Sequence, residues 1–163
     1  MANIIHLRVD SKLVDAQALT HWINTKGVKK IIVIDDEAAK DSMIKTALTA
    51  SLRGVAKIAI YSFDKAKAKY DEDQFGKDKV ILVAKNIDNA KRVYDEIVQF
   101  KEINFVRLPG EPDQKPIAER LSINEKNLED IKAFADRGLN VISGRLSQGY
   151  VLSLEDIEKT YNA

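Results

Sequence analysis

Cysteine is absent from this chain of 163 residues, which excludes disulfide bonds, thiolate metal ligands and cysteine nucleophiles. Proline is scarce, and its three residues all fall between positions 109 and 116, so we expect a surface loop there. Neither sign of charge dominates, because 26 Lys and Arg are balanced by 25 Asp and Glu. A general affinity for nucleic acid or for an anionic membrane is therefore not expected.

Long apolar runs are also missing. The longest, such as residues 79–84, are strand-sized and far below the ~20 residues of a membrane span, so we expect no membrane-spanning segment. The chain begins with a strand-like run instead of the basic start and apolar segment of a signal peptide, which favours a cytoplasmic location. It has no Walker A, G-x-G-x-x-G, H-E-x-x-H or EF-hand pattern, so we expect no cofactor and no metal.

The chain does contain an alternation of β-branched runs with helical patterns. Strands are expected at residues 3–8, 29–34, 55–61, 79–84, 103–108 and 139–144. Helices are expected at residues 15–26, 38–51, 63–71, 87–100 and 125–137, with a short final helix at 153–161. Because several strands are apolar throughout, both of their faces need cover. The pattern predicts a single α/β domain over residues 1–163, with a doubly wound, mostly parallel open sheet, helices on both faces and the first strand near the middle.

Residues that start and end helices support this division of the chain. Gly27 and Gly138 lie where helix C-caps are expected. Ser62, Ser122 and Ser153 are expected N-caps, the last two with an acidic residue three positions later, as in a capping box.

The loop after the first strand is the strongest candidate for a functional site. Ligands of open parallel sheets bind beyond the C-terminal ends of the strands, near helix N-termini. Here Arg8 and Lys12 lie four residues apart, just before a helix start with free N–H groups, which indicates an anion site. An ordinary turn explains the same residues, with Arg8 paired to Asp10 and Asp15 as the N-cap. Composition alone favours the ordinary turn.

The segment Arg8-Val-Asp-Ser-Lys-Leu-Val-Asp-Ala-Gln17 also resembles a family signature. In the mannose/fructose/sorbose-family enzyme IIB components of the bacterial sugar phosphotransferase system, the first strand ends in R-[IV]-D-x-R-L-[IV]-H-G-Q, and a tryptophan follows in the next helix. The matching residues are Arg8, Val9, Asp10, Leu13, Val14, Gln17 and Trp22, with Lys12 in place of the second arginine. Residues 31–38, 121–128 and 136–138 resemble the family too, so the likeness covers nearly the whole chain.

The resemblance implies an activity and a set of partners. A IIB component is a phosphotransferase that takes a phosphoryl group from the phosphohistidine of a IIA partner and gives it to a sugar bound at the membrane components IIC and IID. The implied location is cytoplasmic and peripheral at the inner face of the membrane, with sugar contacted only through those components. By resemblance, Arg8 and Lys12 would hold the phosphoryl oxygens, Asp10 would orient a cation of the loop, and the N–H groups near Ala16 and Gln17 would complete the phosphate site.

Position 15 departs from the family. The acceptor histidine of the signature falls on Asp15, and the glycine beside it falls on Ala16. Neutral imidazole is a nucleophile near pH 7, whereas a carboxylate is already anionic and repels an incoming phosphoryl group. Ala16 adds a methyl group where the family lets the backbone approach the phosphate closely. Two classes of function remain open: a phosphotransferase with unusual chemistry, or a non-catalytic regulatory or docking relative.

The two histidines of the chain are not expected to replace the missing acceptor. His21 lies six residues after Asp15, which places it on another face of the helix and ~9 Å along its axis. His6 lies two residues before Arg8, ~6.6 Å short of the C-terminal end of the strand. Structural or surface roles are expected for both.

An acidic cluster after the second strand favours a rival interpretation. Asp35-Asp36-Glu37 resembles the metal-binding pair of response-regulator receiver domains, and Lys115-Pro116 resembles their Lys-Pro. A receiver needs an acceptor aspartate at the end of a later strand, yet Lys85 and Asn86 follow the run at 79–84. Helix capping by Asp35 or Asp36 explains the cluster without a metal. The receiver-like signalling domain is therefore the weakest of the three possibilities.

Overall fold

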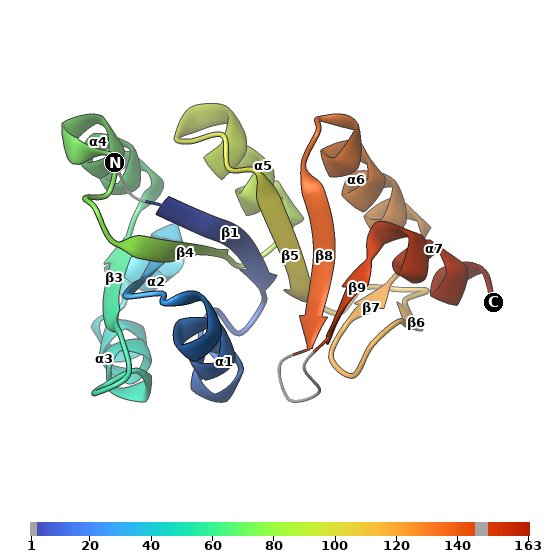
Figure 1. The fold of residues 1–163 in the computed structure, drawn as a ribbon, viewed down its shortest axis with the longest axis horizontal. Coiled ribbons are helices and arrows are strands. Elements are labelled where there is room, and N and C mark those ends of the chain that lie inside the picture. The colour runs from blue at the N-terminus through green and yellow to red at the C-terminus, as the bar shows by residue number, and fades with distance from the viewer. Residues whose placement is uncertain (1–2, 146–149) are drawn as a thin grey trace.

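The computed structural model describes residues 3–145 and 150–163 and contains one large sheet (Figure 1). Its strands in chain order are β1 (Asn3–Asp10), β2 (Lys30–Ile34), β3 (Lys57–Tyr61), β4 (Lys79–Ala84), β5 (Glu102–Arg107), β8 (Asn140–Arg145) and β9 (Tyr150–Ser153). Their spatial order is β3-β2-β4-β1-β5-β8-β9, and every neighbouring pair is parallel except β8 with β9. The predicted parallel sheet with a central first strand is thus confirmed.

Helices cover both faces of the sheet. One face packs against α1 (Ala16–Lys26), α2 (Asp36–Lys40) and α3 (Ser42–Ser51). The other packs against α4 (Phe63–Asp73), α5 (Ile87–Glu96), α6 (Glu125–Asp136) and α7 (Leu154–Asn162). A small antiparallel ladder of β6 (Lys115–Pro116) and β7 (Ser122–Ile123) lies between β5 and α6 in the chain. No helix among the described residues is long and apolar enough to cross a bilayer.

Several helix ends agree with the sequence. The Ser62 side chain accepts from the N–H of Lys65, Ser153 caps α7 in a capping box, and Gly27 ends α1 at a φ of 70°. These contacts satisfy N–H and C=O groups that a helix end leaves without intrahelical partners. The cap at Ser122 was wrong, because Ser122 belongs to β7 and Asn124 caps α6.

The single helix expected at 38–51 was also wrong. It is divided at Asp41, whose carboxylate accepts the N–H groups of Met43 and Ile44 and so starts α3 as a separate helix. Strand β9 was not expected either. It is four residues long and passes directly into α7, so no long periodic run marks it.

Side chains of β1 alternate between the two faces of the sheet. Leu7 and Val9 join the core on the side of α5 and α6. Because successive side chains of a strand point to opposite faces, His6, Arg8 and Asp10 lie on the side of α1. All three are fully buried. The central strand therefore places a row of polar groups inside the domain, and this row leads to the C-terminal edge of the sheet.

His6 is buried against Trp22, with ring centroids 4.7 Å apart, and its Nδ1 lies 3.3 Å from Glu102 Oε2. Burial lowers the pKa of His6 below its usual 6.5, although the Glu102 carboxylate opposes that shift. Below pH 6.5, His6 therefore binds a proton more readily in the unfolded chain than in the folded chain. The free energy of unfolding falls as the pH falls through this range.

We expect His6→Gln to flatten the pH dependence of stability. Between pH 7.5 and 5.5 the wild-type free energy of unfolding should decline, by at most about 1.4 kcal/mol per pH unit from this one proton. The variant should decline less over the same range. Urea unfolding followed by circular dichroism at several pH values measures both slopes. Equal slopes would mean that His6 titrates alike in the folded and unfolded states.

Gly144 in β8 lies where a side chain has no room. A Cβ added there would meet Asn104 Nδ2 at 2.9 Å and Trp22 Cζ2 at 3.0 Å. We expect Gly144→Ala to lower the free energy of unfolding by about 1–3 kcal/mol through overpacking. Gly110→Ala is the matched control, because nothing lies within 4 Å of its added Cβ. Chemical denaturation of the two variants gives the comparison, and equal stabilities would contradict the close approach at β8.

Candidate functional site

β1 and β5 are neighbours in the sheet, and the connections that follow them leave toward opposite faces of the sheet. β1 is followed by α1 on one face, whereas the segment after β5 leads to α6 on the other. Loops that leave adjacent strands toward opposite faces open a crevice at the C-terminal edge, where open α/β sheets bind their ligands. The loop after β1 forms one side of this crevice.

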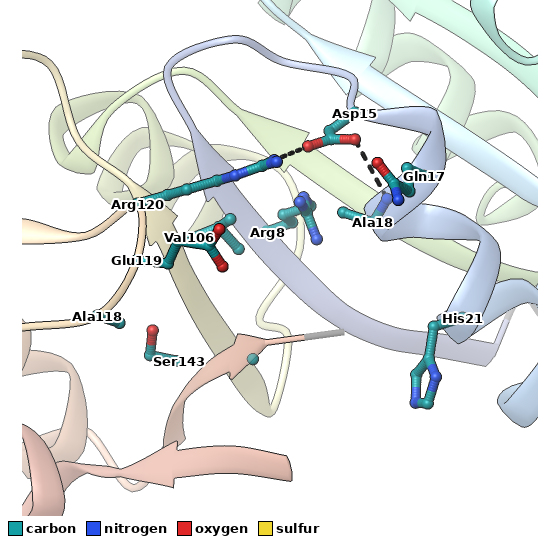
Figure 2. A pocket seen from close by; sticks show the side chains of 11 residues that line it. Arg8, Asp15, Gln17, Ala18, His21, Val106, Ala118, Glu119, Arg120 and Ser143 are labelled. Atoms are coloured by element: carbon teal, nitrogen blue, oxygen red, sulfur yellow. Dashed lines mark hydrogen bonds and ion pairs between the residues drawn. The ribbon is translucent and has the colours of Figure 1, made fainter. Parts of the chain in front are cut away.

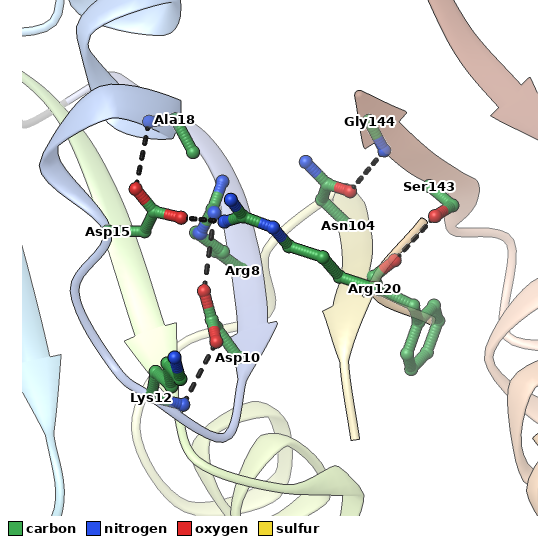
Figure 3. Close-up of polar contacts among 10 residues, drawn as sticks. Arg8, Asp10, Lys12, Asp15, Ala18, Asn104, Arg120, Ser143 and Gly144 are labelled. Atoms are coloured by element: carbon green, nitrogen blue, oxygen red, sulfur yellow. Dashed lines mark hydrogen bonds and ion pairs between the residues drawn. The ribbon is translucent and has the colours of Figure 1, made fainter. Parts of the chain in front are cut away.

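Asp10 organises the start of that loop (Figure 3). Its carboxylate accepts a hydrogen bond from Arg8 Nη2 at 3.2 Å and another from the Lys12 N–H at 2.9 Å. The next residue, Leu13, is buried and has a φ of 64°, and its N–H donates to the Asp10 carbonyl at 2.8 Å. A leucine in the left-handed region is uncommon, and its burial together with these bonds holds the turn in place.

Asp15 joins this loop to a distant part of the chain. Its carboxylate accepts from the Ala18 N–H at 3.2 Å, as the N-cap of α1, and is ion-paired with the Arg120 guanidinium. Burial alone would raise the pKa of Asp15, but the Ala18 N–H, Arg120 and the charge of Arg8 together hold it below its usual value. Asp15 is therefore a carboxylate at neutral pH. Both contacts of the ordinary-turn interpretation, Arg8 with Asp10 and Asp15 as N-cap, are confirmed.

A cavity of about 310 Å³ opens beside these residues (Figure 2). It lies between the start of α1, the ends of β5 and β8, and the segment before β7. Its lining residues are Arg8, Asp15, Gln17, Ala18, His21, Val106, Ala118, Glu119, Arg120, Ser143 and Gly144. The volume is at the lower end of the ~300–1,000 Å³ typical of small-molecule sites.

Arg8 is the buried cation of this cavity. Its side chain has no solvent-exposed surface, and its Nε and Nη1 have no hydrogen-bond partner among the described residues. Burial lowers the pKa of Arg8, while the Asp10 carboxylate opposes that shift, and a guanidinium remains charged at any physiological pH. Unpartnered donors on a buried charge are unfavourable unless water or a ligand completes them. The arrangement is therefore able to bind an anion.

Only some of the residues singled out in the sequence meet in the cavity. Arg8, Asp15 and Gln17 line it, whereas Lys12 has an exposed side chain and is not among the lining residues. Asp10 and Ala16 are not among the lining residues, although Asp10 contacts Arg8 and Ala16 follows Asp15 in the chain. The cation opposite Asp15 is instead Arg120.

Residues of the second half of the chain complete the wall. Arg120 and Ser143 are 105 and 128 positions beyond Asp15, and no periodic or spaced motif marks either of them. The nearest signal in the sequence is the proline-rich segment after the fifth predicted strand, where a surface loop was expected. His21 also lines the cavity, a position that its helical spacing from Asp15 did not suggest.

The acidic cluster after β2 serves local structure. Asp35 caps α2 by accepting the Ala38 N–H at 2.9 Å, as predicted, and Asp36 accepts the Phe63 N–H at 3.0 Å. Within residues 3–145 and 150–163, no group of three or more His, Cys, Asp or Glu side chains is placed to hold a metal ion. The cluster therefore gives no support to a receiver-like metal site.

Comparison with known proteins gives a consistent result. The family model described as "PTS system sorbose subfamily IIB component" matches residues 4–159. Among curated relatives, the fructose-specific EIIB component of Bacillus subtilis is 23% identical, with 98% of this chain and 100% of that protein covered. The mannose-specific EIIAB component of Escherichia coli is 24% identical over 92% of this chain, which spans only 46% of that longer protein.

Solved structures agree on the fold. The structure of manxB from Thermoanaerobacter tengcongensis superposes with a TM-score of 0.88 at 24% identity, covering 100% of this chain and 99% of that one. The IIBSor domain of the sorbose permease from Klebsiella pneumoniae gives a TM-score of 0.81 at 20% identity, covering 97% and 98% of the two chains.

Proposed function

We propose a function for this chain from one premise: it belongs to the sorbose subfamily of IIB components of the sugar phosphotransferase system, whose model matches residues 4–159. Members of this family are phosphotransferase components. We propose that the chain occupies the IIB place in such a system, docking with a IIA partner and working beside membrane components IIC and IID at the cytoplasmic face of the membrane. The fold and the family match support this placement.

The site that would meet the phosphoryl group is the cavity at Arg8. The single observation that carries this assignment is the fully buried Arg8 guanidinium: Arg8 is among the residues that line the cavity, and its Nε and Nη1 have no hydrogen-bond partner among the described residues. The Asp10 carboxylate orients Arg8 from behind, and the N–H groups of Ala16 and Gln17 lack intrahelical acceptors at the start of α1. Arg120, and not the exposed Lys12, supplies the second cation.

Asp15 stands at the position of the acceptor histidine in the family signature, and this defines the proposed role. A carboxylate there would repel the phosphoryl group, and its two contacts, the Ala18 N–H and Arg120, hold it in its charged form. Carboxylate phosphorylation relies on a divalent cation to neutralise such repulsion. We therefore propose that the chain is a regulatory or docking IIB relative that binds its partners without accepting the phosphoryl group.

The negative charge of Asp15 is the basis of this proposed role. It places one fixed negative charge where an ordinary IIB component would carry charge only after phosphorylation, when a phosphate contributes nearly two charges. The chain would thus imitate, incompletely, the phosphorylated state toward its partners. Arg120 would shield part of that charge, because the two side chains are ion-paired.

Phosphoryl transfer from radiolabelled phosphoenolpyruvate, through the general enzymes and a matched IIA protein, tests the proposal. We expect no stable label on the unmodified chain, while a histidine-bearing IIB component in a parallel reaction is labelled. Co-elution of the chain with IIA in size-exclusion chromatography should show that docking is intact. Label on the unmodified chain would overturn the proposal. His21 would be the first residue to examine, because it lines the same cavity.

A further inference from the structure

The cavity at Arg8 is larger than the phosphoryl group it would receive. A phosphoryl group is a compact cluster of one phosphorus and its oxygens, whereas the cavity measures about 310 Å³, which is within the range of small-molecule sites. Figure 2 draws Asp15 and Arg120 beside Arg8, and it draws Ser143 farther from Arg8, with Val106 and Glu119 between them in this view. Ser143 and Gly144 line the same cavity as Arg8, so its wall extends beyond the part next to Arg8.

The rest of this wall has mixed chemistry. Ser143 Oγ donates to the Phe105 carbonyl at 2.7 Å, so its hydroxyl oxygen keeps free lone pairs as an acceptor. Gln17 and His21 contribute an amide and an imidazole from successive turns of α1. Val106 and Ala118 supply apolar surface between these groups. Alternating acceptors, donors and apolar patches match a carbon skeleton that carries hydroxyl groups.

The charges of the site also favour a ligand that carries further groups besides its phosphate. Arg8 is already paired with Asp10, and Arg120 with Asp15, so these four side chains balance one another, and Glu119 adds a further carboxylate to the lining. Inorganic phosphate would gain from the free donors of Arg8 but would meet the repulsion of Asp15. A ligand whose body contacts the rest of the wall adds affinity that the phosphoryl group alone lacks.

We propose that this cavity binds a small organic phosphate, namely a phosphate monoester whose hydroxyl-bearing body fills the space toward Ser143. The phosphoryl oxygens accept hydrogen bonds from Arg8 Nε and Nη1, and the phosphoryl group lies at the start of α1. Arg120 forms the wall of the site beside Asp15. The inference rests on the phosphate site of the proposed function and adds to it a free ligand, bound by the chain itself and not presented on a partner protein.

Isothermal titration calorimetry on the full chain tests the proposal with four probes: inorganic phosphate, glycerol 3-phosphate, a hexose 6-phosphate and the free hexose. We expect the hexose phosphate to bind at least tenfold more tightly than inorganic phosphate, glycerol 3-phosphate to fall between them, and the free hexose to show no binding. Amide chemical shifts should move at Gln17, Ala18 and Gly144 in the presence of the hexose phosphate.

Three variants assign the binding to this cavity. Arg8→Lys keeps a charge beside Asp10 but removes the guanidinium donors, so ester affinity should drop at least tenfold. Arg120→Gln leaves Asp15 unshielded and should weaken binding several-fold, whereas Asp15→Asn should tighten it several-fold. Arg137→Gln is the matched control, because Arg137 pairs with Asp95 on the surface and should leave affinity unchanged. Arg120 and Asp15 are partly exposed, so their variants report on binding even if Arg8→Lys does not fold.

The outcomes separate the inference from the proposed function. If phosphate binds at Arg8 and the esters bind no more tightly, the organic ligand is excluded while the phosphate site stands. If the esters and phosphate bind equally and phosphorylated IIA binds far more tightly than unphosphorylated IIA, the phosphoryl group comes from the partner and the inference is overturned. If no anion binds and Asp15→Asn changes nothing, both the phosphate site and the inference fail.

Discussion

Replacement of Asp10 by alanine is expected to lower the free energy of unfolding by about 3–5 kcal/mol, the typical loss when one partner of a buried ion pair is removed. Both side chains of the Arg8–Asp10 pair are fully buried, with Arg8 Nη2 and Asp10 Oδ2 3.2 Å apart. Without Asp10, the Arg8 charge would have no carboxylate in direct contact among the residues that the structure describes. The Lys12 N–H would also lose its acceptor at the turn.

Urea unfolding of matched variants measures this effect. Asp71→Ala is the control, because Asp71 belongs to an exposed pair with Lys67, and surface pairs of this kind contribute about 0–1 kcal/mol. A double variant, Arg8→Met with Asp10→Asn, removes both charges and should recover most of the lost stability. A loss in Asp10→Ala no greater than in Asp71→Ala would show that the buried charge is stabilised by something other than Asp10.

The double change Asp15→His with Ala16→Gly is expected to convert the chain from one that takes no label into one that takes phosphoryl label from IIA. The change supplies a neutral nucleophile at the start of α1 and removes the methyl group of Ala16. It also releases Arg120 from its ion pair with Asp15, so that this cation can contact the phosphoryl oxygens. Arg8 and its support by Asp10 stay intact.

The assay uses radiolabelled phosphoenolpyruvate, the general enzymes and a matched IIA protein. Label that is stable in base and labile in acid, the behaviour of a phosphoramidate, should appear on the double variant. Asp15→Asn with Ala16→Gly is the control, since it removes the charge without adding a nucleophile and should take no label. A double variant that stays unlabelled while binding IIA normally would mean that the rest of the site has also lost its catalytic arrangement.

Much of the fold could be predicted because strand formation here depends on local apolar runs. The run at residues 79–84 became β4 without a change of bounds, since each of its residues after Lys79 is buried between two helical layers. Errors arose where capping outweighed periodicity, as at Asp41, which divides an apparently continuous helical pattern. Strand β9 depends on pairing with β8 and not on its own four residues.

The candidate site could be predicted only in its first half. Arg8, Asp15 and Gln17 lie within ten residues of each other, so a motif contains them. Arg120 reaches Asp15 only because the sheet order places β5 beside β1, and that order is not encoded in any single segment. The same reason explains why Lys12 was expected in place of Arg120, since Lys12 is near in sequence.

The central position of β1 also determines when the domain can fold during synthesis. The first strand made is the one that needs partners from much later in the chain, namely β4 (Lys79–Ala84) and β5 (Glu102–Arg107). At ~5–20 residues per second, a ribosome completes β5 roughly 5–20 seconds after β1 has been made. The emerging N-terminal half would therefore expose an unpaired strand that carries His6, Arg8 and Asp10, and these polar side chains help to keep that nascent segment hydrated until its neighbours arrive.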